Sequence, residues 1–492
     1  MKDLKEKTVR GGLARLIAQA ADFVLRLVSL MVLARLLGPK DFGLVGMVTA
    51  FTGILVLFRD FGLSVAAVQR PNVTDEQLST LFWINVAVGS LLAVFTAAMA
   101  PFVAAFYHEP RLVGVAGALA CSFLLNALGI QHGALLQRQM RFTALSVVSL
   151  ISLVLSTAIA IGGAILGYGY WALVAMALTQ PLFNTVGVWL ATRWVPGRPR
   201  RRIGIRSMMH FGGTVTLNSI IVYTATNFEK ILLGRYWGAD ALGLYGRAYQ
   251  LINIPTGNLN TAVGEVAFSA LSRLQDDPPR LKSYFLKGYS LVLAMTMPLT
   301  MACALFADDM ILVFLGPKWK AAGIIFRLLA PTILVFAVAN PMSWLVTSLG
   351  MVRRSLKIGL VIAPIMIVAY LIGLPYGPKG VACAYSVVMI LWVIPVIAWS
   401  VHGTAISLSD VLLVASRPFA CSLVAAALGF IVRSLYAQSL SPLPRLTVET
   451  AVLLATFAGM LFFGTGQKAM YVDLFRMVTN RAPAKESSLA SV

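Results

Sequence analysis

The sequence contains little charge for its length. Of its 492 residues only 12% are Asp, Glu, Lys or Arg, whereas 59% are hydrophobic, and the mean hydropathy is +0.82. A soluble domain is usually about 25% charged. A globule of this size would lack the polar surface that water requires. The composition therefore excludes an ordinary soluble protein and predicts a chain embedded in a membrane.

Acidic residues are the scarcer of the charged types. The chain has 19 acidic and 40 basic residues, which gives a net charge of +21. Such an excess is also typical of nucleic-acid-binding proteins. Here, however, the basic residues occur in short patches between apolar runs and form no continuous basic face. This pattern indicates the positive-inside rule of membrane insertion, and we expect no nucleic-acid partner.

Cysteine and histidine are also rare, with four of each. Every cysteine lies in an apolar run and none forms a CxxC pair, so we expect neither a disulfide nor a metal site. The sequence has no HExxH, no P-loop and no Ser/His/Asp arrangement, and we expect no enzyme activity and no cofactor. Asp308 and Asp309 form a lone acidic pair at the end of a span, which we interpret as a solvated terminus.

Long apolar runs follow one another along the chain. A membrane-spanning helix needs about 20 mostly apolar residues, and barrel strands would be shorter and alternating. The runs predict an all-α integral membrane protein with about fourteen transmembrane helices. The expected spans are 11–36, 42–66, 78–105, 112–136, 143–166, 169–192, 208–233, 243–269, 282–306, 322–348, 355–374, 380–401, 410–436 and 446–466.

The loops predict the orientation and the domain boundaries. An even number of spans places both termini on one side, and the more basic set of loops marks that side as cytoplasmic. The most basic connection is RWVPGRPRRR at 193–202, which we interpret as a linker between two halves. The expected parts are a six-helix lobe (1–192), a basic linker (193–206), a second six-helix lobe (207–402), two additional spans (403–466) and a cytoplasmic tail (467–492).

One short motif occurs twice. Residues 33–46 read LARLLGPKDFGLVG, and residues 233–246 read LGRYWGADALGLYG, with one Arg, three Gly and two Leu at matching positions. Further anchors continue the correspondence, for example YGYWALV after the fifth span and YGPKGVA after the eleventh. The order and spacing indicate two parallel copies of a six-span unit, which is a known arrangement in secondary transporters.

Charged and amide side chains within the predicted spans concentrate in the first two spans of each copy. Charges in lipid usually face a cavity or one another, and cations suit an anionic substrate that carries phosphate. The candidate substrate-binding residues are Arg26, Arg59, Lys230, Arg247, Gln250, Asn253 and Asn260. The candidates for ion coupling or for charge pairing are Asp22, Asp60, Glu229 and Glu265. Asp22 and Arg26, one helical turn apart, also fit a purely structural pair.

Several stretches resemble the bacterial polysaccharide transporter branch of the multidrug/oligosaccharidyl-lipid/polysaccharide exporter superfamily. They are ARLLGPKDFGLVG with the following FRDFGLSVAAVQR, ALLQRQMRF (134–142), YGYWALV (168–174) and LGRYWGADALGLYGRAYQL (233–251) leading to FSALSRL. The most specific is ALLQRQMRF, which resembles the subgroup that handles exopolysaccharide or O-antigen repeat units.

The resemblance implies a fold and a function. The fold is V-shaped and two-lobed, works by alternating access, and lines its cleft with spans 1, 2, 7 and 8. The implied function is to flip undecaprenyl-diphosphate-linked oligosaccharide across the bacterial inner membrane for exopolysaccharide, capsule or O-antigen synthesis. Membrane lipids are expected around the chain. Polysaccharide polymerase and glycosyltransferase proteins are candidate partners that the sequence itself does not identify.

Three alternatives remain open. A drug/cation antiporter of the same superfamily would need acidic residues in the cleft, where basic residues here match or outnumber them. A flippase for the peptidoglycan precursor would also have a cationic cleft, and only the subgroup motif ranks it lower. A membrane polymerase or ligase would be expected to have a long external loop, whereas every external loop here is short.

Overall fold

The computed structural model describes residues 2–59, 74–199, 206–435 and 440–464. Inside the helices, the side chains of residues 2–18, 206–222 and 258–262 and of a few other positions are not described. Within these ranges every regular element is helical and no strand occurs. The expected all-helical class is therefore confirmed.

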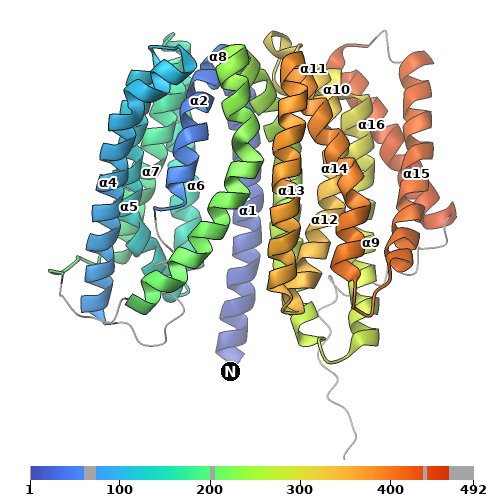
Figure 1. Ribbon diagram of the computed structural model, residues 1–492, viewed down its shortest axis with the longest axis horizontal. Helices are drawn as coiled ribbons and strands as arrows, with labels where there is room; N and C mark the ends of the chain where they lie inside the picture. Colours follow the sequence, from blue (N-terminus) through green and yellow to red (C-terminus); the bar gives the residue numbers. More distant parts are fainter. Residues whose placement is uncertain (1, 60–73, 200–205, 436–439, 465–492) are drawn as a thin grey trace, which may run out of the picture. The chain divides into compact units, whose positions relative to one another are not determined.

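The helices follow the predicted spans closely (Figure 1). The first half contains α1 (Lys2–Leu36), α2 (Pro39–Val56), α4 (Asp75–Tyr107), α5 (Leu112–Arg138), α6 (Phe142–Ile165) and α7 (Tyr170–Thr192). The second half contains α8 (Arg206–Arg273), α9 (Pro278–Leu305), α10 (Ala307–Phe314), η1 (Pro317–Trp319), α11 (Ala322–Leu329), α12 (Pro331–Ser348), α13 (Val352–Gly373), η2 (Leu374–Tyr376), α14 (Gly377–Val401), α15 (Leu408–Leu435), α16 (Pro442–Gly459) and η4 (Met460–Gly464).

Ten helical stretches among the described residues are long and apolar enough to cross a membrane. One of them, 353–401, contains both α13 and α14. Neither α1 nor α8 is among the ten, although α8 extends over 68 residues and bends at Gly238. The membrane-embedded class is supported, and the count of fourteen stays a prediction.

The chain divides into two compact units. Unit 1 comprises residues 1–254, 314–325 and 359–388, and unit 2 comprises residues 255–313, 326–358 and 389–492. Unit 1 combines the first predicted lobe with parts of the second, and unit 2 contains the rest of the second lobe and the two additional spans. The lobe boundaries expected from the sequence stay a prediction.

Unit 1 is built around a group of helices from the first half of the chain. In it α4 packs on α5, α5 and α6 both pack on α7, and α1 packs on α6. Figure 1 shows α4 and α5 side by side, in blue. The described side chains on the outward faces, such as Leu91 and Ile165, are largely exposed, as expected for helices surrounded by lipid.

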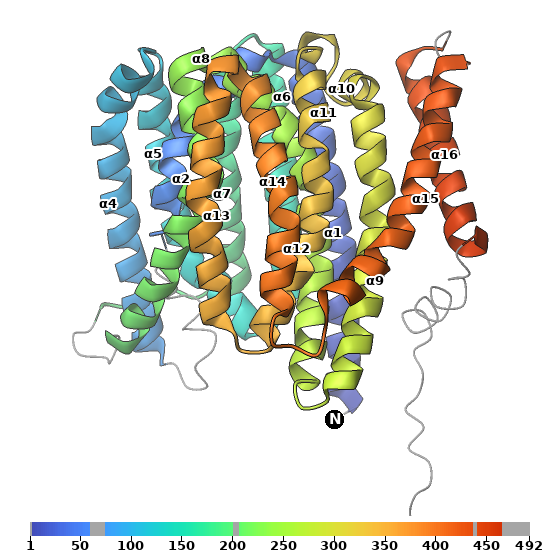
Figure 2. The ribbon, with the colours of Figure 1, turned by 45° about the vertical axis from the view of Figure 1, so that its right-hand side comes forward.

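Unit 2 joins the two additional helices to the second half of the chain. Here α9 packs on α12 and α15, and α15 packs on α16 (Figure 2). A buried core formed by α9, α12 and neighbouring helices includes Phe285, Tyr289 and Leu345. The apolar contact with α15 and α16 includes Phe306, Cys421 and Leu453.

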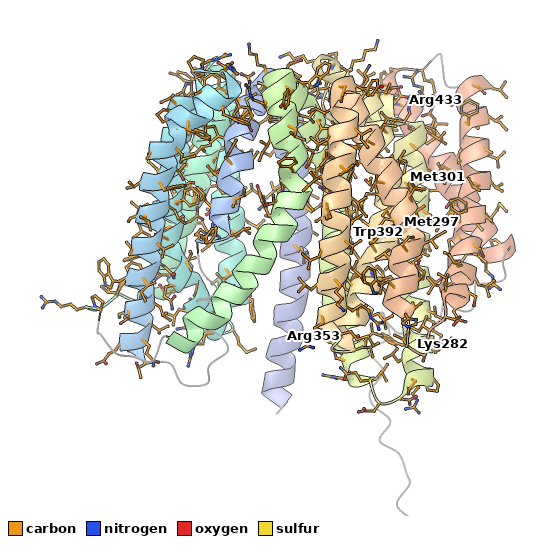
Figure 3. All side chains as sticks on the ribbon, in the orientation of Figure 1. Lys282, Met297, Met301, Arg353, Trp392 and Arg433 are labelled. Atoms are coloured by element: carbon orange, nitrogen blue, oxygen red, sulfur yellow. The ribbon has the colours of Figure 1, made fainter. Side chains whose placement is uncertain are left out.

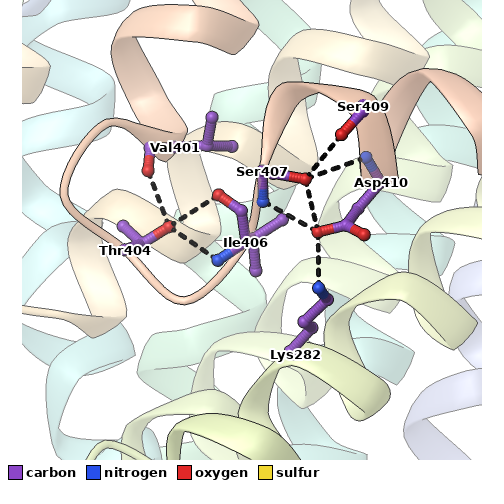
Figure 4. A network of polar contacts seen from close by, with 7 residues as sticks. All are labelled: Lys282, Val401, Thr404, Ile406, Ser407, Ser409 and Asp410. Atoms are coloured by element: carbon purple, nitrogen blue, oxygen red, sulfur yellow. Dashed lines mark hydrogen bonds and ion pairs between the residues drawn. The ribbon is translucent and has the colours of Figure 1, made fainter.

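A polar network holds the start of α15 against α9 (Figure 4). The Oγ of Ser407 accepts a hydrogen bond from the backbone N–H of Asp410, and the Asp410 carboxylate accepts one from the backbone N–H of Ser407. This reciprocal capping box supplies partners for amides that a helix N-terminus otherwise leaves unpaired. The same carboxylate lies 2.6 Å from the Nζ of Lys282 on α9. The cap therefore also anchors α15 to the rest of unit 2.

Candidate functional site

The two copies of the repeated motif lie against each other in unit 1. A Cβ atom added to Gly43 would overlap the backbone of Ala239, and one added to Gly243 would overlap the backbone of Pro39. Each copy therefore presents a glycine to the first turn of the other, in a reciprocal contact typical of two-fold-related surfaces. The glycines recur because two backbones meet where no side chain fits.

Each copy is also held by a tryptophan. Trp319 on η1 donates its Nε1–H to the carbonyl oxygen of Ala34 at 2.7 Å, and its ring packs on Phe42. In the second copy Trp237 donates to the carbonyl oxygen of Leu374 at 2.8 Å. These bonds satisfy carbonyls that helix ends leave without partners. They fasten both motifs within unit 1.

The second motif turns α8 back on itself. Gly238 has φ 79° and ψ −177°, a left-handed conformation that glycine adopts without steric cost. In a straight helix Lys230 and Tyr249 would be about 28 Å apart. Here the Nζ of Lys230 lies 5.5 Å from the centre of the Tyr249 ring. The fold thus brings the polar residues on both arms of α8 to one place, which we call the α8 site.

The part of α8 before Gly238 contributes a carboxylate and an ammonium group to the α8 site. Glu229 is 1% exposed, and among the described residues its Oε2 atom has no hydrogen-bond partner. The neighbouring Lys230 donates to Oδ1 of Asn227 at 2.6 Å. Asn227 in turn donates to the carbonyl oxygen of Tyr223, which fixes its oxygen toward the lysine.

The second arm supplies a guanidinium group. The Cζ of Arg247 lies 4.4 Å from the centre of the Phe42 ring of α2, and its Nη1 donates to Gln250. Its Nε atom is buried, and the described residues offer it no hydrogen-bond partner. Arg247 is therefore held by a ring and an amide rather than by a carboxylate, which leaves its charge available to an anion.

Four tyrosines surround these charges. Tyr245 and Tyr249 of α8 stack with ring centres 6.1 Å apart, and Tyr385 of α14 lies 6.4 Å from Tyr249. Tyr370 of α13 lies 5.7 Å from Tyr385. The hydroxyl of Tyr249 is hydrogen-bonded to Asn253 and Tyr385. The site thus combines two cations, one carboxylate, amides and aromatic faces.

Five of the residues predicted from the sequence meet in the α8 site. Two others, Asp22 and Arg26 of α1, form an ion pair at 2.7 Å with side chains 32% and 54% exposed. None of the described hydrogen bonds of Arg26 reaches the α8 site. Arg59 lies three residues beyond the end of α2. Asp60 and the side chains of Asn260 and Glu265 lie outside the described residues. The five that meet are Glu229, Lys230, Arg247, Gln250 and Asn253.

Sequence reasoning missed Tyr370 and Tyr385 as members of the site. Both are buried although each carries a hydroxyl group, and each interrupts an otherwise apolar predicted span. A buried tyrosine normally needs a polar partner, which was the available signal. Tyr370 contacts Tyr385, and Tyr385 contacts Tyr249 of α8, more than one hundred residues away along the chain, so no local pattern identifies them.

The prediction that the Asp308–Asp309 pair is solvated was wrong for Asp309. Asp308 is half-exposed and pairs with Arg327 at 2.5 Å. Asp309 is 0% exposed and forms ion pairs with Arg445 and with Arg433, the latter at 3.4 Å. Arg433 also lies 4.0 Å from Glu449, which is 0% exposed as well. We call this group in α10, α15 and α16 the C-terminal ion cluster.

The part of the chain that the structure describes contains no group of side chains suited to bind a metal ion. No group of three or more His, Cys, Asp or Glu side chains lies close enough together there to hold a metal ion. The C-terminal ion cluster contains only two acids, and both face arginines.

A family model described as polysaccharide biosynthesis protein matches residues 32–323. The matched segment begins just before the first repeated motif and ends in α11. It includes the whole α8 hairpin and the contact between the two motifs.

Two curated relatives are similar to this chain. The teichuronic acid biosynthesis protein TuaB of Bacillus subtilis (strain 168) is 31% identical over 60% of this chain and 60% of its own length. The chain thus matches less than two thirds of that relative. The lipopolysaccharide biosynthesis protein WzxC of Escherichia coli (strain K12) is 26% identical over 79% of this chain and 80% of its own length.

A solved structure shares the fold. The lipid II flippase MurJ in an inward closed conformation superposes with a TM-score of 0.73, covering 95% of this chain and all of that chain, at 12% identity. Agreement over so much of both chains identifies the helical membrane fold. At this identity the likeness carries no information on cargo.

Proposed function

Because this chain belongs to the polysaccharide biosynthesis protein family, we propose that it is a flippase for lipid-linked oligosaccharides. Its cargo is an oligosaccharide repeat unit on undecaprenyl diphosphate, which it moves across the bacterial inner membrane for exopolysaccharide, capsule or O-antigen synthesis. The names of TuaB and WzxC support a role in the synthesis of surface polysaccharides.

The observation that carries the proposal is the α8 site. Lys230 and Arg247 are cations inside the bundle that no described carboxylate neutralises by an ion pair, and both lie against aromatic rings. A diphosphate offers the charge that such cations lack, and guanidinium groups bind phosphate oxygens with paired donors. The amides of Gln250 and Asn253 and the tyrosine faces suit sugar hydroxyls and sugar rings. Anionic phosphate and polar sugar can thus be held by one continuous site.

In this proposal the reciprocal glycine contact is a place where the bundle opens and closes during alternating access. Backbones that meet without side chains part without rearranging a packed core, and transporter repeats commonly move as rigid bodies around a central site. In this proposal Gly43 and Gly243 keep one end of unit 1 closed while cargo binds from the other side. Glu229, buried and lacking a described hydrogen-bond partner at one oxygen, is the candidate for coupling to a proton or another cation.

A drug/cation antiporter is the competing function. Such a carrier needs acids where its cations bind, and Glu229 is the single acid among the residues that define the α8 site. The flippase for the peptidoglycan precursor also fits a cationic site, and the names of the curated relatives favour surface polysaccharides over it. The location in the inner membrane, the cytoplasmic termini and any polymerase or glycosyltransferase partner are parts of the same proposal.

The experiment is a lipid analysis of a strain that lacks the gene. We expect undecaprenyl-diphosphate-linked oligosaccharide to accumulate on the cytoplasmic side and surface polysaccharide to be lost, and the trapped sugar then identifies the cargo. Unchanged lipid-linked sugars together with increased drug sensitivity would instead establish the antiporter. Accumulation of the peptidoglycan precursor would establish the third function.

A further inference from the structure

A basic groove lies at one end of unit 2. It encloses about 650 Å³ and is lined by Gly350, Met351, Arg353, Arg354, Lys357 and Trp399. Its walls are the start of α13 and the last turn of α14. Three of its six lining residues are cations and none is acidic.

Two of the cations are available for binding. Arg353 and Lys357 are one helical turn apart on α13, so their side chains lie on one face. Both are exposed, and the described residues provide neither of them with an ion pair. Within the described part of the chain, no acidic side chain neutralises the excess charge in the groove.

Arg354 has a different role in the groove. Its Nη1 donates to the carbonyl oxygens of Ser400 at 3.3 Å and His402 at 2.6 Å. It thereby ties the start of α13 to the end of α14. Because a guanidinium group has five N–H donors, this bond still leaves donors that can face the groove.

The surroundings of the groove are those of a membrane interface. Trp399 lies two residues before the end of α14, where tryptophan is enriched in membrane proteins. Deeper along α14, Leu391 and Ile394 are 70% and 57% exposed, as expected for side chains that contact acyl chains. Figure 3 shows Arg353 and Lys282 at one end of unit 2 and Arg433 at the other.

We propose that this groove binds the phosphate headgroup of an anionic lipid. The positive-inside rule accounts for basic residues in a loop, but it does not require them to line a cavity together with a tryptophan. Basic pockets between membrane helices bind anionic headgroups in this manner. The phosphate would contact Arg353 and Lys357, and the acyl chains would run along Leu391 and Ile394.

Two lipids have the required chemistry. One is a bulk phospholipid such as phosphatidylglycerol, and the other is a polyprenyl diphosphate, the carrier in the proposed cargo. The inference does not depend on the proposed function, because the phospholipid can be tested without any cargo. Failure of one proposal is therefore distinguishable from failure of the other.

The test is native mass spectrometry of the full chain with dioleoylphosphatidylglycerol, dioleoylphosphatidylcholine or undecaprenyl diphosphate. The variant is Arg353→Gln/Lys357→Gln. The matched control is Arg280→Gln/Lys287→Gln, which removes two exposed cations from α9 in the same unit. We expect phosphatidylglycerol to bind more tightly than phosphatidylcholine. The groove variant should weaken this binding about 30-fold, and the control should change it by less than about threefold.

The relative affinities for the two anionic lipids identify which of them occupies the groove. If undecaprenyl diphosphate binds no more tightly than phosphatidylglycerol, the occupant is bulk lipid; if it binds at least about tenfold more tightly and is lost in the same variant, the occupant is the carrier. Equal binding of phosphatidylglycerol and phosphatidylcholine, or an equal loss in the control, overturns the proposal.

A second measurement does not rely on charge removal. Brominated phosphatidylglycerol should quench the fluorescence of the natural chain more than that of Trp399→Phe, and brominated phosphatidylcholine should not distinguish them. Equal quenching of both chains by phosphatidylglycerol would also overturn the proposal.

Discussion

The α8 site and the C-terminal ion cluster both place charges inside a helical bundle, but they neutralise them differently. In the C-terminal ion cluster two acids face two arginines, and Arg433 also donates to the carbonyl oxygen of Leu305. In the α8 site Lys230 and Arg247 are held by amides and rings, and Glu229 has an oxygen with no described hydrogen-bond partner.

We interpret this difference as that between a structural role and the binding role proposed for the α8 site. Buried charges are costly unless opposite charges and hydrogen bonds compensate them. In the C-terminal ion cluster each acid faces an arginine, so its charges balance within the described residues, although both oxygens of Glu449 have no described hydrogen-bond partner. We expect this pairing to stabilise the attachment of α15 and α16. The α8 site is compensated incompletely, as expected for a site whose missing partner is a ligand. Substitutions should therefore act on stability in the first and on transport in the second.

The largest effect is expected at Asp309. Asp309→Ala leaves Arg445 and Arg433 without their buried partner, so we expect the free energy of unfolding to fall by about 3–5 kcal/mol. Denaturant titration of the purified protein in detergent measures it. Asp308→Ala is the matched control, since its ion pair with Arg327 is exposed, and we expect a loss of less than about 1 kcal/mol.

A double variant tests whether pairing is the cause. Asp309→Ala/Arg445→Met removes one charge of each sign and leaves Arg433 with Glu449. We expect it to recover most of the stability lost in Asp309→Ala. A double variant that is less stable than Asp309→Ala would show that the C-terminal ion cluster acts through packing instead.

The second effect is on transport at Arg247. Arg247→Glu should reduce restoration of surface polysaccharide in the deletion strain at least about tenfold, because a carboxylate repels the diphosphate. Its amount in the membrane should remain that of the natural chain. Lys379→Glu makes the same charge change at an exposed position of unit 1 and should transport normally. Normal export by Arg247→Glu would contradict the cationic site.

The third effect sharpens the contrast between Glu229 and Asp309. Glu229→Gln replaces a carboxylate that has an oxygen without a described hydrogen-bond partner. We therefore expect the free energy of unfolding to change by less than about 1 kcal/mol. Transport should fall if this carboxylate couples an ion. A loss of stability as large as that of Asp309→Ala would place Glu229 in the structural class.

The smallest effect is expected at a pair outside the spans. Arg111 donates to both oxygens of Glu109, at 2.7 and 2.9 Å, in the turn between α4 and α5. These hydrogen bonds hold the pKa of the Glu109 carboxyl below its ordinary value. Because the folded-state pKa is depressed, the pair contributes stability above the unfolded-state pKa and loses it as pH falls through the folded-state pKa. Glu109→Gln should therefore cost less than about 1 kcal/mol at neutral pH.

The pH dependence supplies the control for Glu109. The difference in melting temperature between Glu109→Gln and the natural chain should vanish in acid. A difference that persists at a pH below the folded-state pKa would mean that the pair does not act through charge.

Sequence patterns predicted much of the α8 site because its signals are local. Gln250 and Asn253 stand out in a mostly apolar run, and the glycines of the repeated motif recur two hundred positions apart. What the pattern could not predict is that Gly43 meets Ala239 while Gly243 meets Pro39, since this contact needs both copies folded together.

The C-terminal ion cluster shows the opposite case. Asp309 sits at the start of a short helix among residues that a sequence pattern assigns to a solvated turn. Its partners, Arg433 and Arg445, come from α15 and α16, more than one hundred residues further along the chain. Burial of an acid depends on what covers it, and no local pattern records that.

The sequence by itself determined that this protein lies in a membrane, that it is helical, and which segment carries its internal charges. Hydropathy and side-chain type are properties of single residues and can be read from the sequence. Only the tertiary structure decided which of those charges are neutralised. An ion pair requires two groups within a few ångströms, and that distance is set by helix packing between distant parts of the chain. The same packing left Arg247 beside an aromatic ring and gave Asp309 two arginines.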